Sequence, residues 1–122
     1  YGEGSPAPGK VLVVKFRLEG QEYLALNGLQ TKPFSEAVSL MVNCKDQQEV
    51  DYYWDKLLAG GGSPIACGWL KDKFGFHWQV TPTLLIEYLH DPDKARAARV
   101  MAAMMQMVKI DLAAIQKAYD GN

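Results

Sequence analysis

Residues 67–82, CGWLKDKFGFHWQVTP, carry the clearest structural signal in the chain. Two short aromatic runs flank a charged turn that closes on Gly75, a residue that readily takes a positive φ. The second run stops at Pro82, which cannot donate a hydrogen bond to a strand ladder. This segment is therefore predicted to form a β-hairpin.

Three further strands are predicted before the hairpin. Residues 11–18 alternate apolar and charged side chains, a pattern typical of a half-buried antiparallel strand. Glu19-Gly20 suits a two-residue turn, so residues 21–26 should return as its partner. The next strand is expected over 37–44. Residues 1–9 are mostly Gly, Pro, Ser and Ala and are predicted to form a flexible loop.

A helix is predicted to begin at Asp46, because Asp46 and Glu49 have the spacing of a capping box. Gly60-Gly61-Gly62 should end it. Its apolar residues recur at helical spacing and indicate one stripe packed on a sheet: Val50, Tyr53, Trp54, Leu57 and Leu58.

The C-terminal part is predicted to be helical. Thr81 and Pro82 suit the N-cap and first position of one helix, and further helices are expected over about 92–108 and, capped by Asp111, 111–119. Apolar residues occupy more than one stripe of the 92–108 helix, including Met101, Met104, Met105 and Met107. Such a helix either covers the sheet or is shared with a second subunit. We favour the second interpretation and expect a homodimer.

Five motifs along the chain resemble one family: Asn27-Gly28, Asp51-x-x-Trp54-x-x-Leu57, Gly60-Gly61, residues 67–72, and Trp78-Gln79. The chain is similar, from about residue 8 to 121, to the 3-demethylubiquinone-9 3-methyltransferase-like (PhnB-like) family of the vicinal-oxygen-chelate superfamily, the glyoxalase and bleomycin-resistance group. The resemblance implies an α+β fold of βαβββ modules in a single domain over 1–122. Residues 10–28 would end an incomplete first module, 34–82 would be the second, and 83–122 would form a helical C-terminal extension. A strand-helix-strand unit is expected to precede the chain as given.

The resemblance also bears on metal binding. In the superfamily, the pattern Asp-x-x-Gly-x-x-x-Glu-Leu contains a metal-binding Glu, and aligning Asp72-x-x-Gly75 with it puts Gln79 at that position. The module's other ligand position falls at Ala37 or Val38, neither of which can coordinate a cation. Of the two histidines, His90 is expected to cap helix carbonyls. We therefore predict no bound metal and no cofactor.

The resemblance implies a ligand pocket on the concave face of the sheet, where Gln79 would lie. His77 and Gln79 should share one face of their strand, with Trp78 on the other. His77 is either a general base in the pocket or an ordinary hydrogen-bonded strand histidine. Trp69 and Trp78 either wall the pocket or belong to the core. Asn27 either donates to a ligand oxygen or only forms a turn.

Composition and motifs bear on the partners, location and reaction type of the protein. A net charge of −1 gives no reason to expect nucleic acid or an anionic membrane as partner, and no apolar run approaches the roughly 20 residues that span a bilayer. Cys44 and Cys67 are expected to be reduced in a cytoplasmic protein. No glycine-rich nucleotide motif supports methyl transfer.

We expect a metal-independent small-molecule binding protein of bleomycin-resistance type with an unknown ligand. The alternatives are a divalent-metal glyoxalase-like or dioxygenase-like enzyme, and a structural or regulatory domain without a ligand.

Overall fold

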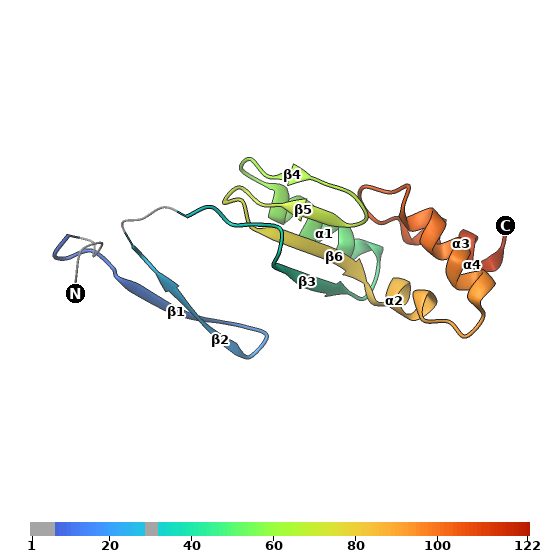
Figure 1. The fold of residues 1–122 in the computed structure, drawn as a ribbon, viewed down its shortest axis with the longest axis horizontal. Helices are drawn as coiled ribbons and strands as arrows, with labels where there is room; N and C mark the ends of the chain where they lie inside the picture. The colour runs from blue at the N-terminus through green and yellow to red at the C-terminus, as the bar shows by residue number, and fades with distance from the viewer. Residues whose placement is uncertain (1–6, 29–31) are drawn as a thin grey trace. The chain divides into compact units, whose positions relative to one another are not determined.

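The computed structural model describes residues 7–28 and 32–122. Most of the loop predicted at 1–9 lies outside these residues. The chain divides into two units, one ending at Pro33 and the other spanning Phe34–Asn122. Figure 1 shows their elements.

The first unit contains a β-hairpin of β1 (Val13–Leu18) and β2 (Gln21–Leu26), paired antiparallel as predicted. Glu19 and Gly20 both have positive φ, 48° and 78°, which matches the right-handed twist of the two strands. The predicted half-burial of residues 11–18 is wrong for β1 within the described chain, because every residue of this strand is exposed.

The second unit begins with the predicted βαβββ module. Its elements are β3 (Ser39–Cys44), α1 (Gln47–Leu58), β4 (Ser63–Pro64), β5 (Trp69–Lys71) and β6 (His77–Pro82). The strand order is β3-β6-β5-β4, with β3 parallel to β6 and the other pairs antiparallel. Together with the helices, this confirms the predicted α+β class and places β6 at the centre of the sheet.

Helix α1 covers one face of this sheet (Figure 1). Its predicted start is confirmed, since the Asp46 carboxylate accepts the Glu49 N–H at 2.9 Å. The Glu49 carboxylate accepts the Lys45 N–H at 2.9 Å and so satisfies a further donor at the helix start. The predicted stripe is confirmed too, and the core between helix and sheet consists of Cys44, Val50, Trp54, Leu70 and Val80.

The hairpin predicted from residues 67–82 is β5–β6. Its turn is organised by Asp72, whose carboxylate Oδ1 accepts the backbone N–H groups of Phe74 at 2.9 Å and Phe76 at 3.0 Å. The backbone closes the same turn, because the Asp72 N–H donates to the Phe76 carbonyl and the Gly75 N–H donates to the Asp72 carbonyl.

Helices α2 (Thr83–Leu89), α3 (Lys94–Met104) and α4 (Leu112–Asp120) follow. The predicted N-cap at Thr81 is wrong: Thr81 is a buried residue of β6, and the extended Pro82 precedes α2. Strand pairing extends past the predicted helix start, because Asn43 and Cys44 of β3 still pair with Thr81 and Pro82.

Helix α3 is also shorter than predicted. It starts after Asp93, whose carboxylate accepts two backbone N–H groups of the first turn, and ends at Met104. The chain leaves the helix because the carbonyls of Met107 and Val108 accept the N–H groups of Cys67 and Gly68, each at 2.8 Å. The predicted helix capped by Asp111 is confirmed as α4.

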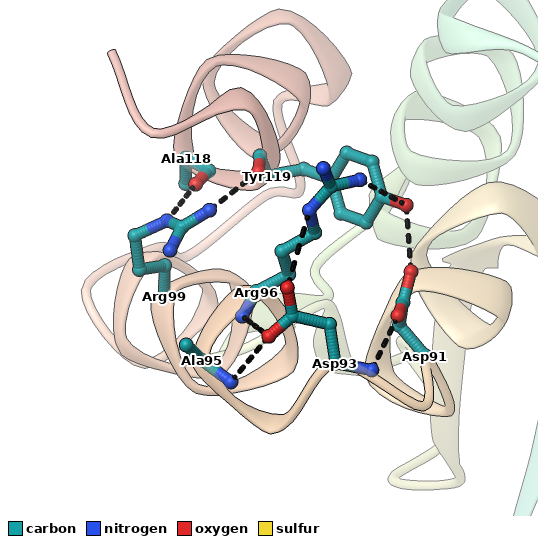
Figure 2. A network of polar contacts seen from close by, with 7 residues as sticks. All are labelled: Asp91, Asp93, Ala95, Arg96, Arg99, Ala118 and Tyr119. Atoms are coloured by element: carbon teal, nitrogen blue, oxygen red, sulfur yellow. Dashed lines mark hydrogen bonds and ion pairs between the residues drawn. The ribbon is translucent and has the colours of Figure 1, made fainter.

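The three helices surround a second core of Leu85, Val100, Ile110 and Ile115. Figure 2 shows how α4 is fastened beside α3: the Tyr119 hydroxyl donates to the Asp91 carboxylate at 2.6 Å and accepts from Arg96. Arg99 donates to the carbonyls of Ala118 and Tyr119, at 2.9 and 2.8 Å.

Helix α1 is joined to the helical extension by Gln47. Its amide donates to the Ile110 carbonyl at 3.1 Å and accepts the Leu112 N–H at 2.8 Å. No helix in residues 7–28 and 32–122 is long and apolar enough to cross a membrane.

Candidate functional site

The candidate site is the face of the β3-β6-β5-β4 sheet opposite α1, which we call the open face. On the central strand β6, Trp78 and Val80 pack with the core under α1. Alternation then puts His77, Gln79 and Thr81 on the opposite face, as predicted for His77 and Gln79.

Strand register extends this face into rows. In the first row, Ser39, His77, Lys71 and Ser63 lie side by side on β3, β6, β5 and β4. Each member carries a polar group, and Lys71 and Ser63 are exposed. The row is therefore a line of hydrogen-bonding side chains that crosses all four strands.

The second row lies two residues further along β6. Gln79 occupies its centre, between Met41 on β3 and Trp69 on β5. The Gln79 amide Nε2 donates to the Ser39 hydroxyl oxygen at 2.9 Å, which ties the two rows together. Met41 is 45% exposed and Trp69 is half-buried, so apolar surface flanks the amide on both sides.

His77 is unusual within the first row. The residue is only 8% exposed, and its Nδ1 atom is buried without a hydrogen-bond partner among the described residues. Buried polar atoms nearly always have partners, because leaving one unpaired carries a desolvation penalty. An unpaired imidazole nitrogen beside polar side chains marks a position where another hydrogen-bonding group is stabilising.

The structure brings His77, Gln79 and Trp69 together on this face but not Trp78, another predicted site residue. Trp78 faces α1, and its indole N–H donates to the Asp72 carboxylate at 2.9 Å. Asn27 belongs to the first unit, where its side chain donates to the Val11 carbonyl at 2.9 Å and its backbone N–H to Leu12.

Sequence reasoning missed Ser39, Met41 and Lys71. Alternation along the 37–44 strand groups Ser39 with Met41, and alternation in the hairpin groups Lys71 with Trp69. The parallel pairing of β3 with β6 puts the first group on the same face as Gln79, and the antiparallel pairing of β5 with β6 adds the second.

The donor set does not suit a divalent cation. Ala37 and Val38, at the predicted ligand position, precede β3, and the side chain that contacts Gln79 is the Ser39 hydroxyl. The face thus offers an amide, a hydroxyl and an imidazole, whereas such cations are usually held by several carboxylate, imidazole or thiolate groups. Within the described ranges, no three His, Cys, Asp or Glu side chains form a metal-binding cluster. His90 caps its helix as predicted, with Nδ1 at 2.8 Å from the Ile86 carbonyl oxygen.

Ionisable groups with clearly shifted pKa values lie away from this face. Burial raises the pKa of the Cys44 thiol to about 11, which keeps it protonated in the core. A hydrogen bond from Lys109 lowers the pKa of Asp51 on α1. Neither group contributes to the rows of the open face.

Comparison with known proteins bears on the same part of the chain. The sequence profile of the 3-demethylubiquinone-9 3-methyltransferase family matches residues 1–81. The match therefore includes the βαβββ module up to the last residue but one of β6, with both rows of the open sheet face, and it stops before α2. No curated protein matches the chain significantly.

Proposed function

The chain belongs to the 3-demethylubiquinone-9 3-methyltransferase family, a glyoxalase/bleomycin-resistance-like group, and from this premise we propose that it binds a small molecule without a metal ion. The binding surface would be the open face of the β3-β6-β5-β4 sheet. The observation that carries the proposal is the hydrogen bond from Gln79 Nε2 to Ser39 Oγ at 2.9 Å.

This contact favours an organic ligand over a cation for two reasons. A carboxamide is neutral, so it lacks the charge with which a Glu would attract a divalent ion. Because one N–H of its NH₂ group donates to Ser39, the amide is held in place, and its second N–H can donate to a ligand acceptor. Apolar contact with Trp69 and Met41 would supply most of the affinity.

Thermal shift measurements test this proposal. The probes are 2-naphthoate, 2-naphthol and indole, each with EDTA and again with Zn²⁺ or Mn²⁺, because a molecule that binds only the folded state raises the melting temperature. We expect at least one probe to raise it equally in EDTA and in metal. Gln79→Ala should reduce the shift, whereas Gln48→Ala, an exposed amide on α1, should leave it unchanged.

Other outcomes would support the alternatives. A shift seen only with metal would favour a glyoxalase-like or dioxygenase-like metalloenzyme. No shift with any probe would favour a structural or regulatory domain. The proposal does not include methyl transfer, because the turn from β3 into α1 is Lys45-Asp46 and carries no glycine-rich nucleotide loop.

We also propose that the protein is a homodimer formed through α3. Ala98, Met101, Ala102 and Met105 recur at i, i+3, i+4 and i+7 and are all exposed, with Met101 at 44% and Met105 at 59%. Met104 and Met107 instead pack against the second core. The helix therefore has one apolar stripe inside the unit and another outside.

The outer stripe is complementary to itself. Two antiparallel copies related by a two-fold axis between Met101 and Ala102 would place Ala98 opposite Met105 and Met101 opposite Ala102. Met105 keeps a helical backbone conformation after the last residue of α3, so the stripe continues to it. Each large side chain would then meet a small one, as close helix packing requires.

We also propose that the protein is cytoplasmic. Cys44 is buried, Cys67 is half-buried, and both are free thiols. Free thiols are usual where glutathione and thioredoxin keep cysteines reduced.

A further inference from the structure

We propose that the ligand of the open sheet face is an aromatic anion, a planar ring that carries a carboxylate. Its ring would lie on the row Met41–Gln79–Trp69, and its carboxylate oxygens would meet the row Ser39–His77–Lys71–Ser63. This inference rests on the proposed binding function and adds the chemical class of the ligand.

The charge of the open face favours a ligand that is negatively charged. The described strand residues on this face are Ser39, Met41, Asn43, Ser63, Trp69, Lys71, His77, Gln79 and Thr81, and none of them is acidic. Lys71 is their one formal positive charge, and it forms no ion pair within the described chain. A carboxylate beside it would be attracted, and a second cation would be repelled.

The nearest acid in the sequence does not cancel this charge. Asp72 follows Lys71 directly, but its carboxylate accepts the backbone N–H groups of Phe74 and Phe76 and the indole N–H of Trp78. These contacts hold it in the turn and toward the α1 side of the sheet. The ammonium group of Lys71 is therefore left for a ligand.

His77 gives the anion a second partner. The tautomer with hydrogen on Nδ1 has a donor that no described residue satisfies, and a carboxylate oxygen would accept it. Lys71 is the neighbour of His77 in the strand register, so the two side chains lie on the same face of the sheet. A neutral ligand without an acceptor at this position would leave the nitrogen unpaired.

The second row selects an aromatic ring. The indole of Trp69 and the thioether of Met41 both make favourable contacts with aromatic surfaces. They flank Gln79, whose amide is tied to Ser39 in the first row. The two rows lie about 7 Å apart along the strands, a span that one ring with one attached carboxylate covers.

Isothermal titration of the full chain with three probes tests the inference. We expect 2-naphthoate to bind about tenfold more tightly than 2-naphthamide, which has the same ring system and no charge. Acetate, which has the charge and no ring, should not bind measurably. Lys71→Gln should weaken 2-naphthoate about tenfold and leave 2-naphthamide unchanged. Lys73→Gln is the control, because this Lys lies in the turn with its ammonium group over the Phe74 ring.

Each other result has a distinct meaning. Equal affinity for 2-naphthoate and 2-naphthamide, unaffected by Lys71→Gln, would overturn the anion while leaving the binding function intact. Measurable binding of acetate at the strength of 2-naphthoate would overturn the role of the ring. If neither naphthalene probe binds, the inference and the proposed function both fail.

Discussion

The indole N–H of Trp78 donates a hydrogen bond to the carboxylate of Asp72 across 2.9 Å, from the second strand of the hairpin back to its turn. The same carboxylate accepts the backbone N–H groups of Phe74 and Phe76. One aspartate thus shapes the turn and fastens the indole of Trp78, which strand alternation places on the α1 side.

Replacing Asp72 by Ala should remove all three of these hydrogen bonds. We expect a loss of about 2–3 kcal/mol in the free energy of unfolding, because bonds to a charged acceptor are among the stronger ones. Urea denaturation checks this value. Asp55→Ala is the matched control on the exposed side of α1 and should change stability by less than about 0.5 kcal/mol. Equal effects of the two substitutions would contradict the role given to Asp72.

Gly68 and Gly75 form a natural pair for a test of close packing. Both have positive φ, 83° and 87°, so Ala strains the backbone at either position. A Cβ at Gly68 would also lie 2.9 Å from the Val80 carbonyl oxygen and 3.1 Å from Ile110, whereas at Gly75 it would meet nothing within 4 Å.

We therefore expect Gly75→Ala to cost about 1–2 kcal/mol of unfolding free energy from strain alone. Gly68→Ala should cost at least about 1 kcal/mol more, because overpacking adds to the strain. Urea denaturation of both variants measures the difference. Similar losses would mean that Gly68 does not lie as close to the Val80 carbonyl and to Ile110 as described.

Stability at low pH should depend on Tyr119. Its hydroxyl donates to Asp91 at 2.6 Å and is the main cause of the lowered pKa of that carboxyl. A carboxyl whose pKa is lower in the folded chain stabilises the fold above its unfolded value, about 3.9, and loses this effect as pH falls through the folded value.

Tyr119→Phe should consequently lower the urea midpoint at pH 7. The gap between wild type and variant should narrow as the pH falls below about 4, and this narrowing is complete only below the lowered pKa of Asp91 in the folded wild type, where the carboxyl is protonated in both. Urea melts at pH 7 and pH 3 test this expectation. A gap that stays constant over this range would show that the loss comes from packing of the Tyr88–Tyr119 rings instead.

The dimer proposal predicts different effects for substitutions at Met101 and Met104, which are close in sequence. Met101→Glu places a charge in the outer stripe, so light scattering should show the mass of one chain for a variant that still folds. Met104→Glu places the charge against the second core, so it should unfold the helical extension, with a loss of about 2 kcal/mol or more. A wild-type chain that is monomeric at tens of micromolar would refute the dimer.

Much of the fold could be predicted because its signals are local. Gly75 and Asp72 mark the hairpin turn, Asp46 with Glu49 marks the start of α1, and alternation places Gln79 on the face opposite Trp78. The family resemblance then supplied the βαβββ order that these local signals alone leave open.

The rest depends on pairing between distant segments. Ser39 and Gln79 are 40 positions apart in the sequence. They come into contact only through the parallel register of β3 with β6. The end of α3 at Met104 likewise depends on hydrogen bonds from Cys67 and Gly68 to the chain just beyond it. Helical periodicity continues past that point, so the sequence pattern alone predicted a longer helix.

Titration of 2-naphthoate into the EDTA-stripped chain, repeated with equimolar Zn²⁺ or Mn²⁺, tests the central claim of metal-independent binding most directly. We predict the same dissociation constant in all conditions for the wild type, and no gain on adding metal to Gln79→Glu, because the module's other ligand position falls at Ala37 or Val38, which cannot coordinate a cation. Binding that requires a metal ion, or about one metal per chain retained in the purified protein, would contradict the account.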